Sequence, residues 1–523
     1  MQRLVSHLVV ALLVFGFFEV SAQRYDFVWL SGYSGGERTA GIDTFGISIM
    51  DFNPDTSLHL INDQANEFRF GEASTMICDS LGNLLFYSNG IEIWNYQNQL
   101  MENGDSLNVD EGLGWYVLTQ GTLALPYPNH DSLWAFIHGT WDIFETTGDV
   151  SIAVSNTWYS IIDMNANDGL GKVVQKMDTL TKKPTTAGHI TACKHGNGRD
   201  WWIVMLEIED CLFSAEICDT ITIKRFLLTP NGIEEYPDFT TEGFILEGGG
   251  VGQARFTSDG NQYVFSSSIG SGRPTSISIY DFDRCEGIFS NYRKVELPRL
   301  GGFDDASFGM EVSPNSRFVY LVRINRVEQF DLWAEDIKAS KIIVAEYDGF
   351  RANFSTKFYL PQLAPDGKIY INTPSTTRYL HVINQPNEKG LACDLQQHSV
   401  VLPTLNGRSF PNHPNYRLYE SVDSPCDTIG KDFTDVSTIA SVKIEQSLKI
   451  YPNPAFDVLH IALDVPKKAS IRLYNVQGQL VLEQSTDQKE QEVDISHLPA
   501  GIYFCHIQTN DHQIQTKKII ISR

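Results

Sequence analysis

The residues best suited to chemistry are polar side chains that recur at or near the start of one strand in a repeated pattern. Among them, the carboxylates Glu72 and Glu311 and the imidazole of His189 could bind a cation or a sugar hydroxyl. Two carboxylates about 5 to 10 Å apart could also hydrolyse a glycosidic bond, although spacing in the sequence does not establish that distance. The candidate ligand-binding residues are Glu72, Gln120, His189, Gln253, Glu311, Gln362 and His413, with Asn412 as the alternative in the last place.

The same polar residues also have a structural interpretation. Buried backbone N–H and C=O groups need hydrogen-bond partners, and a channel lined by polar side chains can hold water that supplies them. Any protein whose inner strands surround a channel would need such a lining. The sequence therefore leaves open whether these residues bind a ligand or only satisfy the strands around them.

Other motifs in the chain do not identify a reaction. Residues 32–36 match GxSxG, but that motif needs a strand running into a helix, and here it lies in a glycine-rich turn of a β-rich chain. Residues 163–174 begin like a calcium-binding loop, yet they have Asp168 where glycine is needed and Val174 where a bidentate glutamate belongs. The sequence thus assigns no catalytic residue, no metal and no cofactor.

The strands that would position the polar residues belong to a repeat. A strand, a turn rich in Asp, Asn, Gly or Pro, and a second strand rich in aromatic residues occur six times. A third strand with alternating apolar and polar residues follows each pair. The copies begin at Ser74, Gly121, His189, Ala254, Met310 and Pro361, and the third strands begin at Gly46, Gly90, Thr157, Thr220, Ser276, Ser340 and Tyr379.

Seven third strands with six first strands predict an all-β fold, a seven-bladed β-propeller over residues 23–420. We expect the strand from Asn412 to lie innermost in the first blade, which would close the ring and remove its open edges. About 57 residues per blade exceed the roughly 40 to 45 of a typical blade, and we expect the excess in loops. Residues 231–243 and 329–339 are two such predicted loops.

The N-terminus and the charge indicate the compartment. Residues 1–22 have the pattern of a signal peptide, with Arg3, an apolar run at 8–18 and small residues before a cleavage site after Ala22. The run is too short to span a membrane, and no later segment is long and apolar enough to be an integral membrane segment. A net charge of -24 argues against nucleic acid and membrane surfaces as partners. In an exported chain, Cys211 and Cys218 could form a disulfide across a hairpin.

The C-terminal part has a different pattern. Residues 421–446 read as a polar linker, and 447–523 contain short alternating strands typical of a small β-sandwich. Three motifs there, YPNPA, LPAGIYF and a terminal KKIIISR, resemble the type A C-terminal sorting domain of the type IX (Por) secretion system of Bacteroidetes. The residues that carry this resemblance are Tyr451, Pro452, Asn453, Pro454, Leu498, Pro499, Gly501, Tyr503, Lys517 and Lys518.

The resemblance implies a route and a partner. The chain would cross the inner membrane by its signal peptide, pass the periplasm, and cross the outer membrane through the type IX secretion machinery, to be secreted or held on the cell surface. The body, with GNLLFYSNG at 82–90 and APDGKIY at 364–370, is similar to secreted Bacteroidetes proteins with WD40-like or YVTN-like propellers. We expect an extracellular platform that binds a protein or glycan. The alternatives are a hydrolase or lyase acting on polysaccharide or peptide at the channel mouth, and a structural component of adhesion or gliding.

Overall fold

The computed structural model describes most of the chain after the predicted signal peptide. Its contacts divide the chain into two compact units, Met1–Val436 and Ser437–Arg523, and the boundary in the sequence falls inside the predicted linker. Residues 1–22 and the Cys211 and Cys218 pair lie outside the described residues, so those predictions stay open. The described residues are 23–33, 45–53, 58–63, 68–108, 118–146, 149–208, 220–242, 252–267, 275–298, 306–421, 426, 449–453, 455–462, 469–475, 480–499, 501–509 and 514–522.

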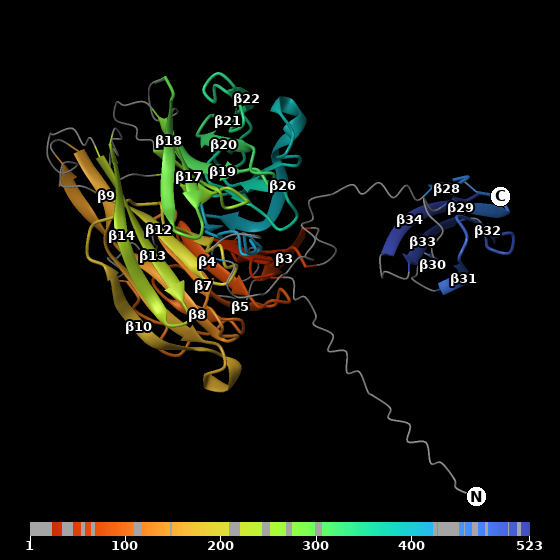
Figure 1. Cartoon of the computed structure of the whole chain (residues 1–523), viewed down its shortest axis with the longest axis horizontal. Coiled ribbons are helices and arrows are strands. Elements are labelled where there is room, and N and C mark those ends of the chain that lie inside the picture. The colour runs from red at the N-terminus through yellow and green to blue at the C-terminus, as the bar shows by residue number, and fades with distance from the viewer. Residues whose placement is uncertain are drawn as a thin grey trace, which may run out of the picture. The chain divides into compact units, whose positions relative to one another are not determined.

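The first unit is a seven-bladed β-propeller, and each blade is one sheet (Figure 1). The first three blades are built as follows. Blade 1 has β1 (Val28–Gly32), β2 (Ile47–Asp51) and β3 (His59–Asp63); blade 2 has β4 (Ala73–Cys78), β5 (Leu84–Ser88) and β6 (Ile93–Asn95) together with β27 (Phe410–Pro411); blade 3 has β7 (Thr122–Pro126), β8 (Leu133–Thr146), β9 (Asp149–Asp163) and β10 (Lys172–Thr181).

The other four blades have four strands each, in chain order from the inside outward. Short 3-10 helices lie at η2 (Asn167–Gly169) and η5 (Gly390–Cys393). Blade 4 has β11 (Thr191–Lys194), β12 (Trp201–Glu207), β13 (Thr220–Thr229) and β14 (Gly232–Glu242); blade 5 has β15 (Ala254–Phe256), β16 (Gln262–Ser267), β17 (Ser276–Asp283) and β18 (Ile288–Glu296); blade 6 has β19 (Ser307–Val312), β20 (Phe318–Arg323), β21 (Arg326–Asp331) and β22 (Ile342–Glu346); blade 7 has β23 (Pro361–Leu363), β24 (Ile369–Ile371), β25 (Thr377–Ile383) and β26 (Leu395–Asn406).

The predicted repeat is confirmed on the inner strands. Each of the six predicted copies contains the first strand of one blade in chain order, namely β4, β7, β11, β15, β19 and β23. Neighbouring members of this set are in contact, as β4 is with β7 and as β11, β15, β19 and β23 are in succession. The turn after β4 shows why the pattern works. Asp79 Oδ1 accepts hydrogen bonds from the backbone N–H of Leu81 at 2.8 Å and of Asn83 at 2.9 Å, so the polar turn residues replace the missing strand partners.

Two of the loop predictions are wrong, because the segments contain strands. Most of residues 231–243 form the outer strand β14 (Gly232–Glu242). Residues 329–339 include the end of β21, which makes β22 the fourth strand of blade 6 and not the third. Both errors concern strands whose polar sequences hide the alternation. None of the described side chains of β14 is fully buried, so this strand tolerates Glu and Asp. Its free edge also tolerates Pro237, which lies opposite a register shift between Ile223 and Arg225. Part of the extra length per blade therefore lies in long strands and not in loops.

Ring closure also differs from the prediction. The C-terminal strand β27 does not pair inside blade 1; it lies parallel to β4 of blade 2, with Phe410 opposite Ala73 and Pro411 opposite Ser74. Pro411, which ends β27, and Pro414 directly flank the pair Asn412 and His413. Because proline has no N–H to donate, this segment cannot form a long ladder, and its side chains make the bonds instead.

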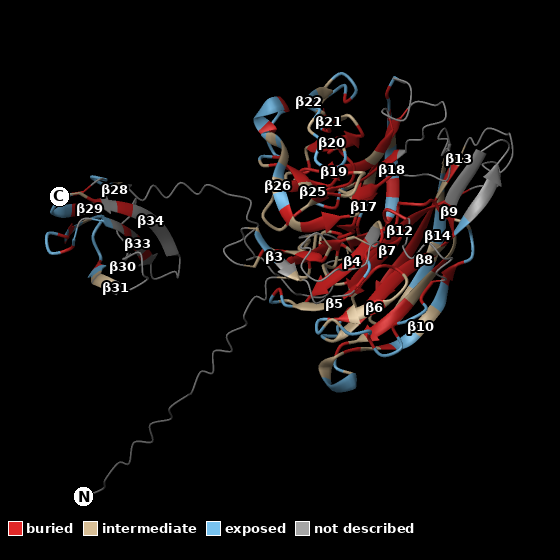
Figure 2. Cartoon of the chain, turned by 180° about the vertical axis from the view of Figure 1, so that it is seen from behind, coloured by how far each residue is buried: buried red, intermediate tan, exposed pale blue. Residues whose placement is uncertain are grey.

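Apolar side chains fill the spaces between the blades. Every residue of β12 is buried, because inner and middle strands have a neighbouring blade on both faces. The outer strand β18 instead has only two buried residues, Phe289 and Val295. Figure 2 shows this gradient, with buried ribbon on the inner strands and exposed ribbon on β10 and the far part of β26. The packing leaves the centre of the ring to polar side chains.

The second unit has two small sheets. One contains β28 (Lys449–Tyr451), β29 (Val458–Ala462) and β32 (Glu490–Asp494), and the other contains β30 (Ala469–Asn475), β31 (Leu480–Thr486), β33 (Gly501–Thr509) and β34 (Ile514–Ile521). Their inward side chains form one apolar core that includes Leu459, Leu473 and Ile507. Among the described residues of the whole chain, no helix has the length and hydropathy to cross a membrane.

We predict that Trp29→Ala destabilises the propeller by about 3–5 kcal/mol, the usual cost of a cavity left by a large core aromatic. Trp29 is 1% exposed, and its ring centroid lies 5.0 Å from Phe52, 6.1 Å from Tyr370 and 5.6 Å from Phe410, so it joins three parts of the ring. Urea unfolding followed by tryptophan fluorescence and circular dichroism measures the change. The control Trp333→Ala removes a side chain that is 66% exposed and should cost less than about 1 kcal/mol.

Candidate functional site

The closing segment, residues 408–421, runs through the centre of the ring. It begins beside the start of β4, at the end of the channel that we call the start mouth. Halfway along, the Tyr416 hydroxyl donates to the carbonyl of Ala124 on β7 at 2.8 Å. At the other end, the Ser421 N–H donates to the carbonyl of Gly196, in the turn after β11, at 2.7 Å. We call that end, where the inner strands turn, the turn mouth.

Asn412 holds this segment in place. Its Nδ2 donates to the carbonyls of Thr122 at 2.9 Å and Ile190 at 3.0 Å. Its Oδ1 accepts from Gln120 Nε2 at 3.0 Å and from Arg255 Nη1 at 3.2 Å. An asparagine amide offers two donors and one oxygen with two lone pairs, so all its capacity is used. The partners come from blades 3, 4 and 5, and Asn412 is buried.

Arg255 extends the network to blades 6 and 7. Its Nε donates to Glu311 Oε2 at 3.1 Å, and its Nη2 donates to Gln362 Oε1 at 3.0 Å. Glu311 also accepts from the backbone N–H of Leu363 at 3.0 Å. Arg255 and Glu311 are both buried, and a buried ion pair is retained when further hydrogen bonds satisfy its remaining atoms, as they do here.

Two glutamines bond to the backbone of another inner strand. Gln120 Nε2 donates to the carbonyl of Ala254 at 3.1 Å, and its Oε1 accepts from the N–H of the same residue at 2.7 Å. Gln253 Oε1 accepts from the N–H of Met310 at 3.0 Å. The side-chain amides therefore act like one extra residue of strand pairing between blades that no backbone ladder connects.

The two histidines of the set are also bonded within the chain. His189 accepts at Nδ1 from the Thr186 hydroxyl at 2.8 Å, and its Nε2 lies 3.0 Å from the carbonyl of Ser266. His413 places Nε2 3.0 Å from the carbonyl of Met76. Each carbonyl requires the proton on Nε2. Burial lowers the pKa of both imidazoles to about 4, so both are neutral at pH 7.

Glu72 lies apart from this network, at the start mouth. Its Oε2 accepts from the Tyr359 hydroxyl at 2.9 Å, and its Oε1 is 2.8 Å from Arg408 Nη1. Burial raises the pKa of Glu72, while Arg408 and Tyr359 act to lower it. The carbonyl of Arg408 accepts from Asn372 Nδ2 at 2.9 Å, which fixes the loop that carries the guanidinium. The Arg408 side chain is 32% exposed and that of Glu72 is 12% exposed.

The structure thus brings six of the seven predicted residues into contact with the closing segment beyond Arg408 or with a strand of a neighbouring blade. Glu72 lies at the mouth, where it bonds to Arg408 and Tyr359. Their ligand-binding role stays a prediction. Sequence reasoning did not identify Arg255, Tyr359 and Arg408, because each lies outside the repeated position that defined the set. The sequence did contain a signal for the closing segment, since two prolines flank Asn412 and His413 in a chain that otherwise alternates.

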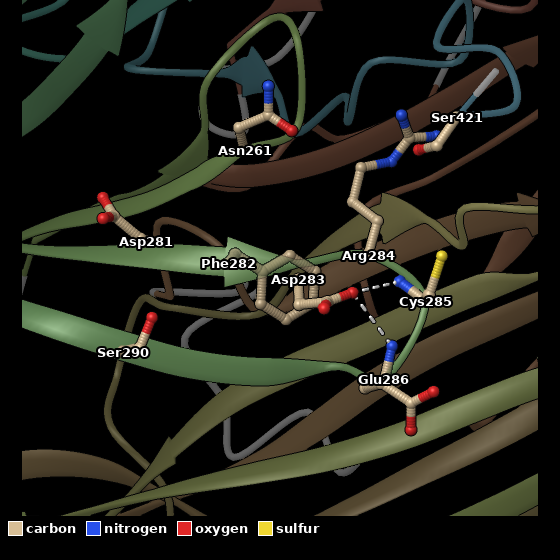
Figure 3. Close-up of a pocket in the computed structure, with 9 residues that line it drawn as sticks. All are labelled: Asn261, Asp281, Phe282, Asp283, Arg284, Cys285, Glu286, Ser290 and Ser421. Carbon is tan, nitrogen blue, oxygen red and sulfur yellow. Dashed lines mark hydrogen bonds between the residues drawn. The ribbon is translucent and has the colours of Figure 1, made fainter. Parts of the chain in front are cut away.

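A second concave feature lies at the turn mouth of blade 5. This cleft has a volume of about 440 Å³ and is lined by the turn between β17 and β18, with Asn261 and Ser421 at its rim (Figure 3). Two of its carboxylates are engaged, since Asp281 binds Arg293 at 2.5 Å and Asp283 Oδ1 accepts from the N–H of Cys285 at 2.8 Å. Within the described residues, no group of three or more His, Cys, Asp or Glu side chains could hold a metal ion.

The residues of the predicted sorting motif lie in the second unit. Tyr451 ends β28 and bonds through its hydroxyl to Glu490, and the Tyr503 hydroxyl donates to the carbonyl of Pro499 at 2.8 Å. Leu498 is in the apolar core. The others are Pro452 and Asn453 in the loop after β28, Gly501 at the start of β33, and Lys517 and Lys518 on β34, whereas Pro454 lies outside the described residues.

Comparison with known proteins identifies this second unit. Residues 449–522 match the family described as the secretion system C-terminal sorting domain. This match confirms the expected export: the chain carries a type IX sorting domain, its partner is the secretion machinery, and it is secreted to the cell surface or beyond. The match covers only the C-terminal part, so it assigns no activity to the propeller.

Two curated relatives are also matched over short stretches. Ulvan lyase NLR42 of Nonlabens ulvanivorans is 32% identical over 89 residues, which cover 16% of this chain and 17% of the lyase. Beta-agarase D of Zobellia galactanivorans is 31% identical over 110 residues, which cover 20% of this chain and 22% of the agarase. The chain therefore spans less than a quarter of either relative.

Solved structures resemble the chain only distantly. PorZ, a surface component of the type-IX secretion system of Porphyromonas gingivalis, aligns with 92% of this chain and 69% of its own at 11% identity and a TM-score of 0.30. A putative 6-phosphogluconolactonase from Bacteroides uniformis aligns with 75% of this chain and 98% of its own at 10% identity and a TM-score of 0.32. These values carry no functional argument.

We predict that Asn412→Ala destabilises the propeller by roughly 3–5 kcal/mol. The substitution removes one hydrogen-bond partner from each of four groups: the carbonyls of Thr122 and Ile190, the amide of Gln120 and the guanidinium of Arg255. Each such loss costs about 1–3 kcal/mol before the structure relaxes. Chemical unfolding of the full chain measures the effect. Asn384→Ala is the matched control, because that amide bonds only to Asp394 at the surface and should change stability by less than about 1 kcal/mol. Equal effects of the two substitutions would contradict the central role of Asn412.

We predict that the propeller loses stability as the pH falls from 6.5 to 4. His189 and His413 have a lower pKa in the folded chain than in the unfolded chain, so the unfolded chain binds more protons in this window and the free energy of unfolding falls with pH. The expected loss is on the order of 3 kcal/mol for each imidazole. Thermal unfolding at a series of pH values measures it.

His413→Gln tests the assignment, since glutamine can donate to Met76 without titrating and should flatten the pH profile. Near His413, Asp26 raises its pKa while Arg417 and Arg255 lower it, so burial remains the main cause of the shift. The control His398→Gln changes a half-buried surface histidine paired with Asp348 and should leave the profile between pH 6.5 and 4 steep. A profile unchanged by His413→Gln would contradict the prediction.

Proposed function

We propose that this chain is an extracellular binding platform whose propeller holds a neutral glycan at the start mouth, around Glu72, Tyr359 and Arg408. The observation that carries the proposal is the division among the seven predicted residues. Six are buried and bond to the closing segment beyond Arg408 or to strands of neighbouring blades, whereas Glu72 bonds to Arg408 and Tyr359 at the mouth and has a more exposed side chain than any of them. We therefore place the ligand at the start mouth and not on the wall of the channel.

The chemistry of the Glu72 cluster suits hydroxyl groups. A carboxylate accepts hydrogen bonds from sugar hydroxyls, and a guanidinium donates several in one plane. Glu72 and Arg408 lie 2.8 Å apart and neutralise each other, so the cluster has no net charge to attract an ion. Tyr359 supplies an aromatic ring beside them, and Phe308 lies 5.1 Å from that ring. This combination is typical of sites that bind polyhydroxylated ligands.

Charge favours a neutral glycan over an anionic one. The chain has a net charge of -24, and the 32 basic and 56 acidic residues before Ser447 place all of that excess outside the sorting domain. A polyanionic polysaccharide would be repelled by such a field unless a basic patch received it. The matched relatives are named as a lyase and an agarase, which supports polysaccharides as the class of ligand to test.

A catalytic role is the second candidate. Burial raises the pKa of Glu72, which is the shift that a general acid needs, and its partner Tyr359 also ionises with difficulty because burial and Glu72 raise its pKa. The cluster has only one carboxylate, whereas glycoside hydrolysis in most families uses two. Binding without turnover is therefore the function that we propose.

We predict that the full chain binds neutral agarose-derived oligosaccharides and that Glu72→Gln weakens this binding at least tenfold, since a charge-assisted hydrogen bond is worth about 1.5–3 kcal/mol. Isothermal titration calorimetry gives the dissociation constants. Glu102→Gln is the control, because Glu102 pairs with Lys172 at 2.6 Å on the outside of blade 3.

The test has three decisive outcomes. Equal affinity of Glu72→Gln and the unchanged chain contradicts the assigned cluster, and tighter binding of ulvan-derived acidic oligosaccharides contradicts the choice of a neutral ligand. If new reducing ends or unsaturated sugars appear and their formation depends on Glu72, the chain is an enzyme and the proposal of binding without turnover is wrong.

A further inference from the structure

The closing segment leaves the channel through a prepared opening at the turn mouth. Three glycines in the turns of blades 4 and 5 give it room, and any side chain at these positions would meet the segment. Close approach of this kind is a common reason for glycine in a turn. A Cβ would lie 2.7 Å from Glu420 N at Gly198, 2.7 Å from Leu418 Cδ2 at Gly260 and 2.3 Å from Cys426 Sγ at Gly196.

Arg284 fixes the same part of the segment from blade 5. Its Nε donates to the carbonyl of Lys194 at 2.9 Å, and its Nη2 donates to the carbonyls of His195, at 3.3 Å, and Tyr419. Figure 3 shows the Arg284 guanidinium beside Ser421. Cys285, the residue after Arg284, lies on the same turn. Cys285 forms a disulfide with Cys426, whose Cα lies 5.5 Å away. The covalent bond thus continues the set of contacts that hold the exit.

Without this bond the exit would depend on weak contacts. The contacts of the described residues 417–421 include hydrogen bonds and an ion pair in which Arg417 Nη1 lies 2.5 Å from Asp26 Oδ1. Single contacts of this kind at a partly exposed site contribute about 1 kcal/mol or less each. The disulfide closes a loop between residues 141 apart in the sequence, which strongly restricts the unfolded chain. It is therefore the strongest single link between the closing segment and the blades.

We propose that the Cys285–Cys426 disulfide is a redox latch that keeps the closing segment in the channel, so that the propeller closes stably only after the chain reaches an oxidising compartment. Reduction would release the exit at the turn mouth, while Asn412 still holds the segment near the start mouth. The latch also lies between the propeller and the sorting domain in sequence, so removal of residues beyond Cys426 would leave the ring closed.

The chemistry is a thiol–disulfide exchange. The two thiols of Cys285 and Cys426 give up two protons and two electrons as the S–S bond forms, and the electrons reduce the disulfide of an oxidoreductase, which becomes a dithiol. Reduction reverses the balance, with a dithiol reagent as the electron donor. Cys78, Cys193, Cys393 and Cys505 are free and buried, so among the described cysteines only this pair is exchanged.

The test compares tryptic cleavage at the two ends of the closing segment. Arg417 lies at the exit and Arg408 at the start mouth, and their side chains are 35% and 32% exposed, so each serves as the control for the other. In the full chain carrying Cys285→Ser and Cys426→Ser, we expect cleavage after Arg417 to be at least tenfold faster by mass spectrometry, with cleavage after Arg408 unchanged. We also expect Tm to fall by about 5–10 °C.

A second variant keeps the test decisive. Cys211→Ser with Cys218→Ser should leave both cleavage rates unchanged, and mild reduction of the folded chain in that background should reproduce the effect of losing Cys285 and Cys426. If the Cys285→Ser and Cys426→Ser chain fails to fold while this variant folds, the need for the bond is shown directly. The proposal is overturned if both thiols are free in chain secreted to the medium, or if cleavage after Arg417 is equally slow with and without the bond.

Discussion

In the centre of the ring, the amide of Asn412 bonds to four partners from three blades, and the closing of the whole propeller depends on this interaction. A propeller must join its last blade to its first, and the common solution is a strand shared between the two ends of the chain. Here the shared strand β27 has only two residues, because the prolines around it prevent a longer ladder. Side-chain hydrogen bonds therefore join the closing segment to the blades in place of a backbone ladder. Arg255 and its partners then connect that amide to the remaining inner strands.

This solution has a consequence for function. A channel occupied by the chain's own segment offers little to a ligand, and the polar residues that line it are buried and hydrogen-bond within the protein. The chain can still present its two mouths. At the start mouth, Glu72, Tyr359 and Arg408 form a compact cluster with partly exposed polar atoms, and at the turn mouth the disulfide fixes the exit. Binding at the first and closure at the second are therefore separate properties of one segment.

Much of the fold could be predicted from the sequence. The inner strands were found because the turn after each has residues such as Asp79 and Asn83, whose side chains have to bond locally. The outer strand β14 does not stand out in the sequence, because none of its described side chains is fully buried and its apolar alternation is therefore weak. The set of polar residues was found by its repeated position. Their partners were not, since Arg255 and Ala254 meet Asn412 and Gln120 across more than a hundred residues, and no local pattern predicts such contacts.

The most direct test of the account is hydrogen exchange of the closing segment in the native full chain. Because Asn412 and its neighbours lie in the centre of the ring, we expect the amides of residues 410–416 to exchange only by global unfolding, as slowly as those of β4 beside them. Exchange measured by mass spectrometry on overlapping peptides resolves the two segments. Exchange of residues 410–416 at the rate of an exposed loop, with β4 still protected, would show that the channel is open and would contradict the account.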